Sequence, residues 1–384
     1  MKKLYLIILS TIFLLACSEK DVIITIENPT DFDRMTELVE IPIDSIKDRI
    51  VVSDSLVYVI KTTEGEIIPS QVTYDRKIIF QPQLKANESK SFMIETGEVQ
   101  HFTPKTFGRL LSGHKDGFVW ENDRVAFRMY DPAGMETNSP GNGINIWYKR
   151  TNNLIIDKWY KEDASGTISY QEDPSEGLND YKTGYSLGAG AMSPYVDSKL
   201  WLNENFVSEE LLDNGPLRTT FKLTYNNLNI NGQSVAESRT ISLDAGSQLS
   251  KVIQAYTIKE TMPVAAGFVK REKGDSIISS LEKNYIIYAE PTTPKTSGVY
   301  LGLVFLQGMT ESKIDTYEVI NPLTNKKEKH SHVLGITAQQ PNIPVTYYTG
   351  YGWSEFGFPT LSDFERYIQT FSEGLKQPLT IKYN

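Results

Sequence analysis

The sequence predicts an all-β protein: a small N-terminal β-sandwich, then a larger antiparallel β-sandwich built from two sheets, with one helix near the C-terminus. Short apolar runs with alternating polar residues, separated by turn residues, continue along nearly the whole chain. Helical spacing of apolar residues stands out in a single segment, near the C-terminus. The chain shows no repeat of 20 to 50 residues, which argues against a propeller or a solenoid.

The first sixteen residues predict a cleaved signal peptide. Lys2 and Lys3 precede an apolar run from 4 to 16, and Cys17 follows. The run is shorter than the ~20 apolar residues that a spanning helix needs. Residues 14–17, Leu-Leu-Ala-Cys, fit a lipobox, in which the cysteine thiol takes a diacylglycerol and becomes the new N-terminus. We therefore expect cleavage before Cys17 and attachment to a membrane through lipid alone.

Residues 17–21 follow the predicted cleavage point. Ser18 to Asp21 resembles the charged tag that polysaccharide-degrading bacteria place on surface-exposed lipoproteins. This start predicts an outer-membrane lipoprotein that faces either the cell surface or the periplasm.

Charge and cysteine content exclude several classes of protein. Cys17 is the single cysteine, so neither disulfides nor thiolate metal sites are available once it is acylated. The formal net charge of −9 becomes −11 when Lys2 and Lys3 leave with the signal peptide, which makes nucleic acid an implausible partner. An anionic substrate would need a local basic pocket.

Histidine offers one candidate metal pair. Of four histidines, only His330 and His332 are close in sequence, and alternate residues of a strand point the same way. The alternative is a solvated loop, because the pair follows the charged run 326–329. We favour the loop and predict neither a metal nor a cofactor.

Residues 22–100 are predicted to form the small N-terminal sandwich. The predicted strands are 24–26, 41–43, 57–61, 78–80 and 92–94, with turns at 64–65 and 75–76. A unit of this length is a normal size for a small domain. A linker with Pro104 follows.

Residues 107–384 are predicted to form the large sandwich. Alternation is clear at 124–130, 219–225 and 299–305, and turn residues gather at 229–232 and 244–247. Near the end, Ser362 and Glu365 fit a capping box ahead of apolar residues at helical spacing. This helix should end between 374 and 377, before Pro378.

Three stretches pack polar and aromatic residues between glycines: 113–124, 170–190 and 347–354. Loops on a rigid scaffold commonly carry sites. None of the stretches matches a general catalytic motif. Acidic residues in the second stretch could supply the carboxylate pair of a glycoside hydrolase or form a solvated, calcium-binding loop. The aromatic residues suit either a core or a sugar-binding face.

The same stretches carry a family resemblance. The chain resembles a family long catalogued as a domain of unknown function that occurs in polysaccharide-utilisation loci. The resemblance spans about residues 22 to 384 and rests on 120–128, 176–190, 214–221, 347–353 and 378–379.

One branch of that family is similar to this chain in its lipoprotein start: the oligosaccharide dehydratase of ulvan breakdown. The resemblance implies removal of water from a non-reducing-end glucuronic or iduronic acid, which leaves a 4,5-unsaturated uronyl residue. It also implies uronic-acid-containing oligosaccharides as partners. Strand density, chain length and a resemblance to many carbohydrate-active proteins favour a mutarotase-like supersandwich for the large domain, with a jelly roll as the nearest alternative. Where the resemblance leads one to expect a histidine beside Tyr170, this chain has Gln171.

That reaction needs a cation or convergent donors against the sugar carboxylate. Arginine matches a carboxylate best, because its fork binds both oxygens. Arg124 is our candidate clamp, helped by Asn122. The alternative is a structural Arg124 paired with Glu121 or Asp123.

The reaction also needs a base for the C5 proton and an acid for the departing hydroxyl. Tyrosine and histidine suit both roles in a cationic pocket. The candidates are His114, Tyr181 and Tyr185, with Lys182 as an alternative base; His114 has a purely structural alternative. Further predicted substrate contacts are Glu176, Tyr348 and Trp353.

Two rival functions stay open at this point. A polysaccharide lyase would apply the same chemistry to an internal uronyl bond, and a glycan-binding lipoprotein would catalyse nothing. The residues alone do not separate them.

Overall fold

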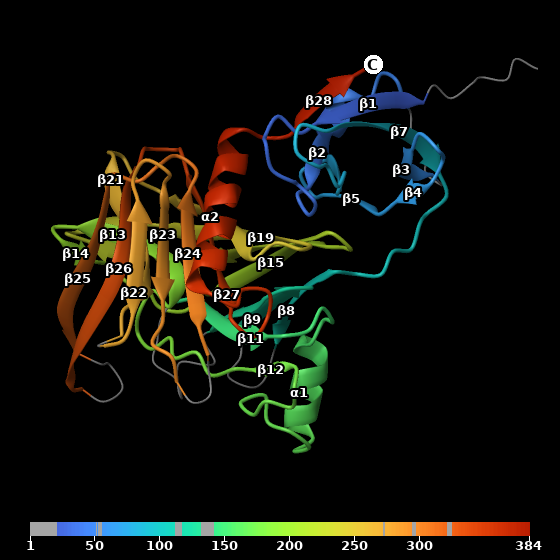
Figure 1. Ribbon diagram of the computed structural model, residues 1–384. Helices are drawn as coiled ribbons and strands as arrows, with labels where there is room; N and C mark the ends of the chain where they lie inside the picture. Colours follow the sequence, from blue (N-terminus) through green and yellow to red (C-terminus); the bar gives the residue numbers. More distant parts are fainter. Residues whose placement is uncertain are drawn as a thin grey trace, which may run out of the picture.

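The computed structural model describes residues 21–50, 52, 56–111, 117–131, 142–271, 273–293, 297–320 and 325–384. The predicted leader, Cys17 and His114 lie outside these residues. The predicted all-β architecture is confirmed: antiparallel sheets form nearly all of the described chain (Figure 1). Among the described residues, no helix is long and apolar enough to cross a membrane.

The small N-terminal domain contains two sheets. The first has the order β28 (Thr380–Tyr383), β1 (Val22–Glu27), β7 (Ser89–Gly97), β3 (Val57–Thr62) and β4 (Ile67–Ile68). The second has the order β2 (Val39–Pro42), β6 (Lys77–Phe80) and β5 (Ser70–Val72), and a short 3-10 helix η1 (Ile43–Ser45) follows β2. Alternate residues of these strands, such as Ile24, Ile26, Phe92 and Ile94, fill a separate core.

The last strand of the chain returns to this small domain. β28 pairs with β1, and Ile381 lies opposite Ile26. Ile381 and Tyr383 pack against the core of the small domain. The sequence predicts that the large sandwich extends to residue 384. The last strand, β28, belongs to the small domain instead, because its alternating apolar residues pack against residues from the start of the chain.

The large domain is a sandwich of two layers. One layer is the eight-stranded sheet, here called the β24 sheet: β15 (Ser208–Asn214), β16 (Arg218–Thr224), β19 (Glu237–Asp244), β20 (Leu249–Tyr256), β27 (Val345–Trp353), β24 (Val299–Phe305), β23 (Tyr285–Ala289) and β22 (Ser276–Ser280). A two-stranded hairpin joins β17 (Leu228–Ile230) to β18 (Gln233–Val235).

Two five-stranded sheets form the other layer. The β21 sheet has the order β14 (Lys199–Leu200), β13 (Ala189–Val196), β21 (Met262–Val269), β26 (Lys327–Gln339) and β25 (Glu311–Ile320). The β9 sheet has the order β12 (Gly177–Leu178), β11 (Asn145–Lys149), β10 (Ala126–Met129), β9 (Gly117–Asn122) and β8 (Thr106–Leu111).

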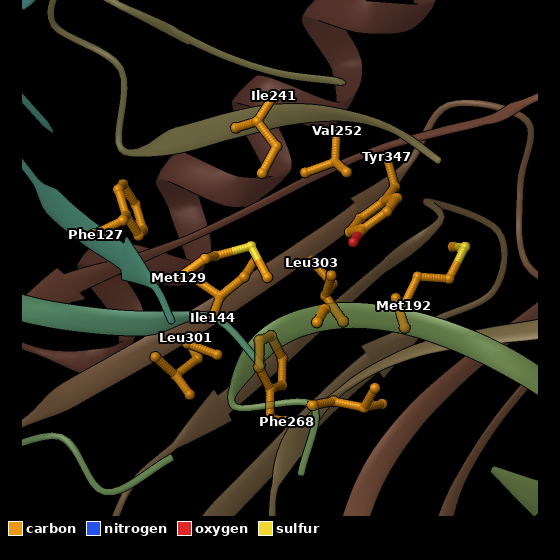
Figure 2. Packing of buried hydrophobic residues seen from close by; sticks show 14 of the residues in the cluster. Phe127, Met129, Ile144, Met192, Ile241, Val252, Phe268, Leu301, Leu303 and Tyr347 are labelled. Atoms are coloured by element: carbon orange, nitrogen blue, oxygen red, sulfur yellow. The ribbon is translucent and has the colours of Figure 1, made fainter. Parts of the chain in front are cut away.

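One continuous apolar core joins the layers. Side chains from all three sheets meet there, including Phe127, Met192, Val252, Phe268 and Leu301 (Figure 2). Neighbouring residues of each strand point away from this core, so each layer has an outer face on which a site can be built.

The two helices differ in how they begin. α2 (Leu361–Lys376) covers the outer face of the β24 sheet through Phe364 and Ile368. Its capping box joins Thr360 to Asp363, two residues before the box that the sequence predicts, and it ends inside the predicted range. α1 (Ile156–Ala164) was not predicted and begins without a side-chain cap of its own.

Candidate active site

The outer face of the β21 sheet carries an unusual pair of histidines. If Gly335 of β26 carried a Cβ atom, that atom would touch Phe305 and Ile286 of the β24 sheet, on the other side of the core. Gly335 and the other odd-numbered residues of β26 therefore face the core. His330 and His332 therefore point to the outer face. Their segment, interpreted from the sequence as a solvated loop, is a strand, because β26 pairs with β21 on one side and with β25 on the other.

Tyr317 of β25 lies against both histidine rings. Its ring centroid is 5.7 Å from that of His332, and the two planes are 5° apart. The centroid of His330 is 6.2 Å away, at 28°. The ladder causes this arrangement, since it pairs Tyr317 with His330 and Asp315 with His332.

His332 is fully buried and has a defined tautomer. Its Nε2 accepts a hydrogen bond from the Leu187 backbone N–H at 3.2 Å, which places the ring proton on Nδ1. Burial, with a smaller contribution from His330, lowers the pKa of His332 to about 3, so the ring is neutral at neutral pH. The Nδ1–H has no hydrogen-bond partner within the described part of the chain.

Two more buried oxygens of this cluster have no hydrogen-bond partner among the described residues. They are the Tyr317 hydroxyl and Asp315 Oδ2. Burial first, then the neighbouring Tyr185 and Asp315, raise the pKa of Tyr317. Native proteins leave few buried polar atoms unsatisfied, so these three atoms are candidates for contact with a ligand or with water.

His330 reaches solvent and has an acidic partner. Its Nε2 lies 3.3 Å from Glu328 Oε2 on the same strand, and 12% of its side chain is exposed. A carboxylate at one nitrogen orients an imidazole for proton transfer at the other.

The segment 181–188 crosses this face and supplies Tyr185. Gly184 and Gly188 both have φ of +61°, a conformation that glycine adopts without strain, and they bracket the turn that presents Tyr185. Asn145 of β11 anchors the start of the segment by donating to the Tyr181 carbonyl at 2.9 Å and to the Thr183 hydroxyl at 3.1 Å. Tyr185 is half-buried, and burial raises its pKa.

Arg271 adds a cation at the end of β21. The ladder pairs Val269 with His332, and the Lys270 N–H donates to the Ser331 carbonyl at 2.7 Å. Arg271 follows directly after this hydrogen bond, just beyond the last residue pair of the ladder.

Three contacts hold the Arg271 guanidinium. Its Nε donates to Glu290 at 3.0 Å, its Nη2 donates to the Lys182 carbonyl at 3.0 Å, and its carbon lies 5.2 Å from the Tyr181 ring centroid. Burial disfavours the charge, but Tyr181 and Glu290 outweigh burial and raise the pKa of Arg271. Nη1 makes no hydrogen bond within the described residues, so it is available to a ligand.

Three of the residues predicted for catalysis lie on the segment 181–188. Tyr181 is buried beneath Arg271, and its hydroxyl has no hydrogen-bond partner among the described residues. Lys182 is 74% exposed and lies 3.2 Å from Asp180. Tyr185 lies close enough to Tyr317 to contribute to the raised pKa of that residue. The fourth, His114, lies outside the described residues.

Asn122 and Arg124 lie at the opposite end of the β9 sheet. Asn122 is fully buried, donates to the carbonyls of Asp244 and Ser247 at 2.6 and 2.8 Å, and accepts from the N–H groups of Arg124 and Val125. The Arg124 guanidinium lies 5.8 Å from the Phe356 ring centroid. The structure therefore does not bring these two residues together with Tyr181 and Tyr185.

The three predicted substrate contacts are also spread over the molecule. Glu176 binds Lys158 at 2.6 Å. Trp353 is buried, with Arg150 5.3 Å from its ring centroid. Tyr348 lies on the outer face of the β24 sheet, 5.0 Å from Phe371 of α2.

Sequence reasoning missed Tyr317 and Arg271 and set His330 and His332 aside. The available signal was the spacing of the two histidines, which placed them on one face of any strand. In the described part of the chain, no group of three or more histidine, cysteine, aspartate or glutamate side chains is arranged to hold a metal ion.

Comparison with known proteins gives one family match and several distant structural ones. Residues 26–381 match the family described as Domain of unknown function (DUF4861). A protein of Formosa agariphila called "Uncharacterized protein P7" is 29% identical over 400 residues, which cover 98% of each chain.

Two solved structures from Enterococcus faecalis are similar to this chain to different extents. A protein in the glycosyl hydrolase family 38 superposes with a TM-score of 0.52 at 9% identity, over 96% of this chain and 48% of that one. An α-mannosidase gives a TM-score of 0.49 at 8% identity, over 95% of this chain and 46% of that one. The chain thus spans about half the length of these two structures. The first match shows a shared fold and nothing about activity.

Proposed function

The chain belongs to the family described as Domain of unknown function (DUF4861), and we propose that it is a carbohydrate-active hydro-lyase. In this proposal it removes water from the non-reducing-end uronic acid of ulvan-type oligosaccharides and leaves a 4,5-unsaturated uronyl residue. The observation that carries the proposal is the outer face of the β21 sheet, where Tyr185 lies near the His330–Tyr317–His332 cluster and Arg271 follows the end of β21.

The cation supports a carboxylate-bearing substrate. Arg271 is held by Glu290 and Lys182 but keeps Nη1 available, and an arginine binds a carboxylate more specifically than a lysine does. The reaction places extra negative charge on that carboxylate when the C5 proton leaves. A preorganised donor at such a position commonly contributes about 3 to 4 kcal/mol to catalysis.

The solvent-facing side chains can move the protons. In the proposed reaction one of His330 and Tyr185 takes the C5 proton, and the other gives a proton to the C4 hydroxyl. The C4–O bond breaks, water leaves, and the C5–H electron pair becomes the C4–C5 double bond. Tyr317 would position His330 through the contact between their rings, and His332 would in turn hold the Tyr317 ring.

Two further features support a sugar substrate. The fold is shared with part of a protein in the glycosyl hydrolase family 38, which is support by analogy only. The predicted lipid anchor at Cys17 would display the domain at the outer membrane, where polymer fragments arrive.

The test is incubation of the purified mature protein with saturated uronyl-rhamnose-sulfate oligosaccharides. We expect the ultraviolet absorbance of the new unsaturated uronyl group together with loss of one water from the substrate mass. Chain cleavage with the same absorbance would instead identify a polysaccharide lyase. Binding without either change would identify a glycan-binding protein.

Substitutions then test the site. His330→Ala should lower turnover by more than about a hundredfold, the low end for an acid–base group, and Arg271→Met should act similarly. His101→Ala is the matched control, because His101 is exposed in the linker. Wild-type turnover in both site variants would place the reaction elsewhere, and His114→Ala would then test the remaining predicted acid.

A further inference from the structure

The opposite side of the large sandwich holds a cavity that the proposed reaction does not use. It has a volume of about 510 Å³ and lies between α2, the outer face of the β24 sheet and residues 32–40 of the small domain. α2 runs between the sandwich and the small domain (Figure 1). The volume falls within the range of roughly 300–1,000 Å³ that small-molecule sites occupy.

The floor of the cavity is a row of side chains across three strands. The ladders pair Ser242 with Lys251, and Lys251 with Tyr348, so all three point to the same outer face. The Tyr348 ring meets the edge of Phe371, at 5.0 Å between centroids and 71° between planes. The aromatic rings of Tyr348 and Phe371 therefore lie beside Lys251.

Most of the charges around the cavity neutralise one another. Arg218 donates to both oxygens of Asp244 at 2.5 and 2.9 Å, and to Glu40 at 2.6 Å. Arg34 is paired with Glu37 and also donates to two carbonyls at the end of α2.

Two charged groups stand outside these pairs. Asp33 lies at the exposed rim and accepts from the Ala86 N–H. Lys251 is half-buried and makes no hydrogen bond or ion pair with any described residue, so its ammonium group is the cation left for a ligand.

We propose that this cavity is a second, non-catalytic binding site for one anionic sugar unit. The ammonium of Lys251 binds the carboxylate or sulfate, and Tyr348 and Phe371 contact the apolar C–H face of the ring. The hydroxyl of Ser242 and the paired carboxylates of Glu40 and Asp244 offer hydrogen bonds to the sugar hydroxyls. This site lies across the sandwich from Arg271 and His330, so it does not depend on the proposed reaction.

Binding at this site would link the two domains. The walls come from the small domain, the β24 sheet and α2, so an occupied cavity ties together parts that are far apart in sequence. A ligand that binds only the folded, closed arrangement raises the thermal stability of the whole chain.

Calorimetric titration tests the proposal with three probes: methyl glucuronide, a sulfated methyl rhamnoside and neutral methyl rhamnoside. The protein carries His330→Ala and Arg271→Met, so that the other face contributes neither binding nor turnover. We expect both anionic probes, or one of them, to bind and the neutral probe to bind at least about tenfold more weakly. Which anion binds distinguishes a uronate site from a sulfate site.

Three variants locate the binding. Lys251→Met should weaken it at least about tenfold, and Lys251→Arg should retain it. Thr370→Trp fills the cavity from α2 and should abolish it. Lys222→Met is the matched control, because Lys222 is an exposed lysine on the same sheet that does not line the cavity. Circular dichroism checks that each variant is folded.

Three outcomes overturn the proposal. The first is equal binding of neutral and anionic probes, and the second is unchanged binding in Lys251→Met. The third is loss of turnover when Lys251→Met is placed in the otherwise wild-type chain, since the cavity would then be the reaction site. Failure of dehydration in the wild-type chain, with anion binding intact, would remove the proposed function and leave this site.

Discussion

Two buried polar clusters of the large domain differ in how well their atoms are satisfied. In the first, Lys149 donates to Glu121 at 2.9 Å and to the Asn122 carbonyl at 2.5 Å. Glu121 also accepts from the N–H groups of Ile155 and Ile156, where α1 begins. In the second, His332, Tyr317 and Asp315 each keep a buried atom without a hydrogen-bond partner among the described residues.

We infer from this difference that the first cluster serves stability and the second serves function. Both charged groups of the Lys149–Glu121 pair are buried and bonded inside the chain, so the pair fixes a helix to a sheet. The histidine cluster keeps polar atoms without a partner among the described residues, and such atoms can bind a ligand or water.

The largest effect should come from breaking the satisfied pair. Lys149→Met leaves the buried Glu121 carboxylate without its cation, which typically costs about 3–5 kcal/mol of unfolding free energy. Urea unfolding measures the change. The double variant Lys149→Met/Glu121→Gln should recover part of the loss, because the amide oxygen still accepts from α1. A loss below about 1 kcal/mol in the single variant would show that the pair is not important for stability.

Acid should destabilise the fold through His332. The unfolded chain binds a proton near pH 6.5, whereas the folded chain does so near pH 3, so the unfolded state holds more protons between these values. Stability therefore falls as pH drops through that window, by up to about 1.4 kcal/mol per pH unit.

The measurement is the pH dependence of unfolding in His332→Phe compared with the wild-type chain. The variant should lose this part of the slope, whereas His101→Ala, at an exposed position, should keep it. An identical slope in His332→Phe would mean that the ring protonates in the folded chain.

A smaller loss is expected at the exposed start of α2. Thr360 accepts from the Asp363 N–H, and Asp363 in turn accepts from the Thr360 N–H. Thr360→Ala should cost about 1 kcal/mol. Thr370→Ala, in the same helix away from the cap, is the control. Thermal unfolding of the two variants should differ by that amount, and equal stability would show that the box contributes nothing.

The same comparison explains what could be predicted from sequence. The strands and α2 follow from local periodicity and local caps, so the fold class was accessible. α1 was not, because the acceptor at its start is Glu121, more than thirty residues earlier in the chain. Long-range partners leave no local pattern.

The candidate site divides in the same way. Tyr181, Lys182 and Tyr185 were predicted because one glycine-bounded stretch contains them. Tyr317 was missed because only the register of β26 with β25 brings it to His330. Arg271 was missed because its partners, Glu290 and the Lys182 carbonyl, lie elsewhere in the sequence. Arg124, chosen for its strand start, lies against Phe356 instead.

The smallest change in stability should come from the unsatisfied cluster. Tyr317→Phe removes a buried hydroxyl that has no partner among the described residues, so the unfolding free energy should change by less than about 0.5 kcal/mol. Turnover should nevertheless fall at least about tenfold with an altered pH profile, because the Tyr317 ring lies against both histidine rings and its hydroxyl influences proton transfer at His330. A loss of more than about 2 kcal/mol would mean that the hydroxyl has a partner of its own and belongs with the satisfied cluster. Unchanged turnover with unchanged stability would mean that the Tyr317 hydroxyl contributes neither to catalysis nor to stability. The contrast between the two clusters would then no longer identify a site.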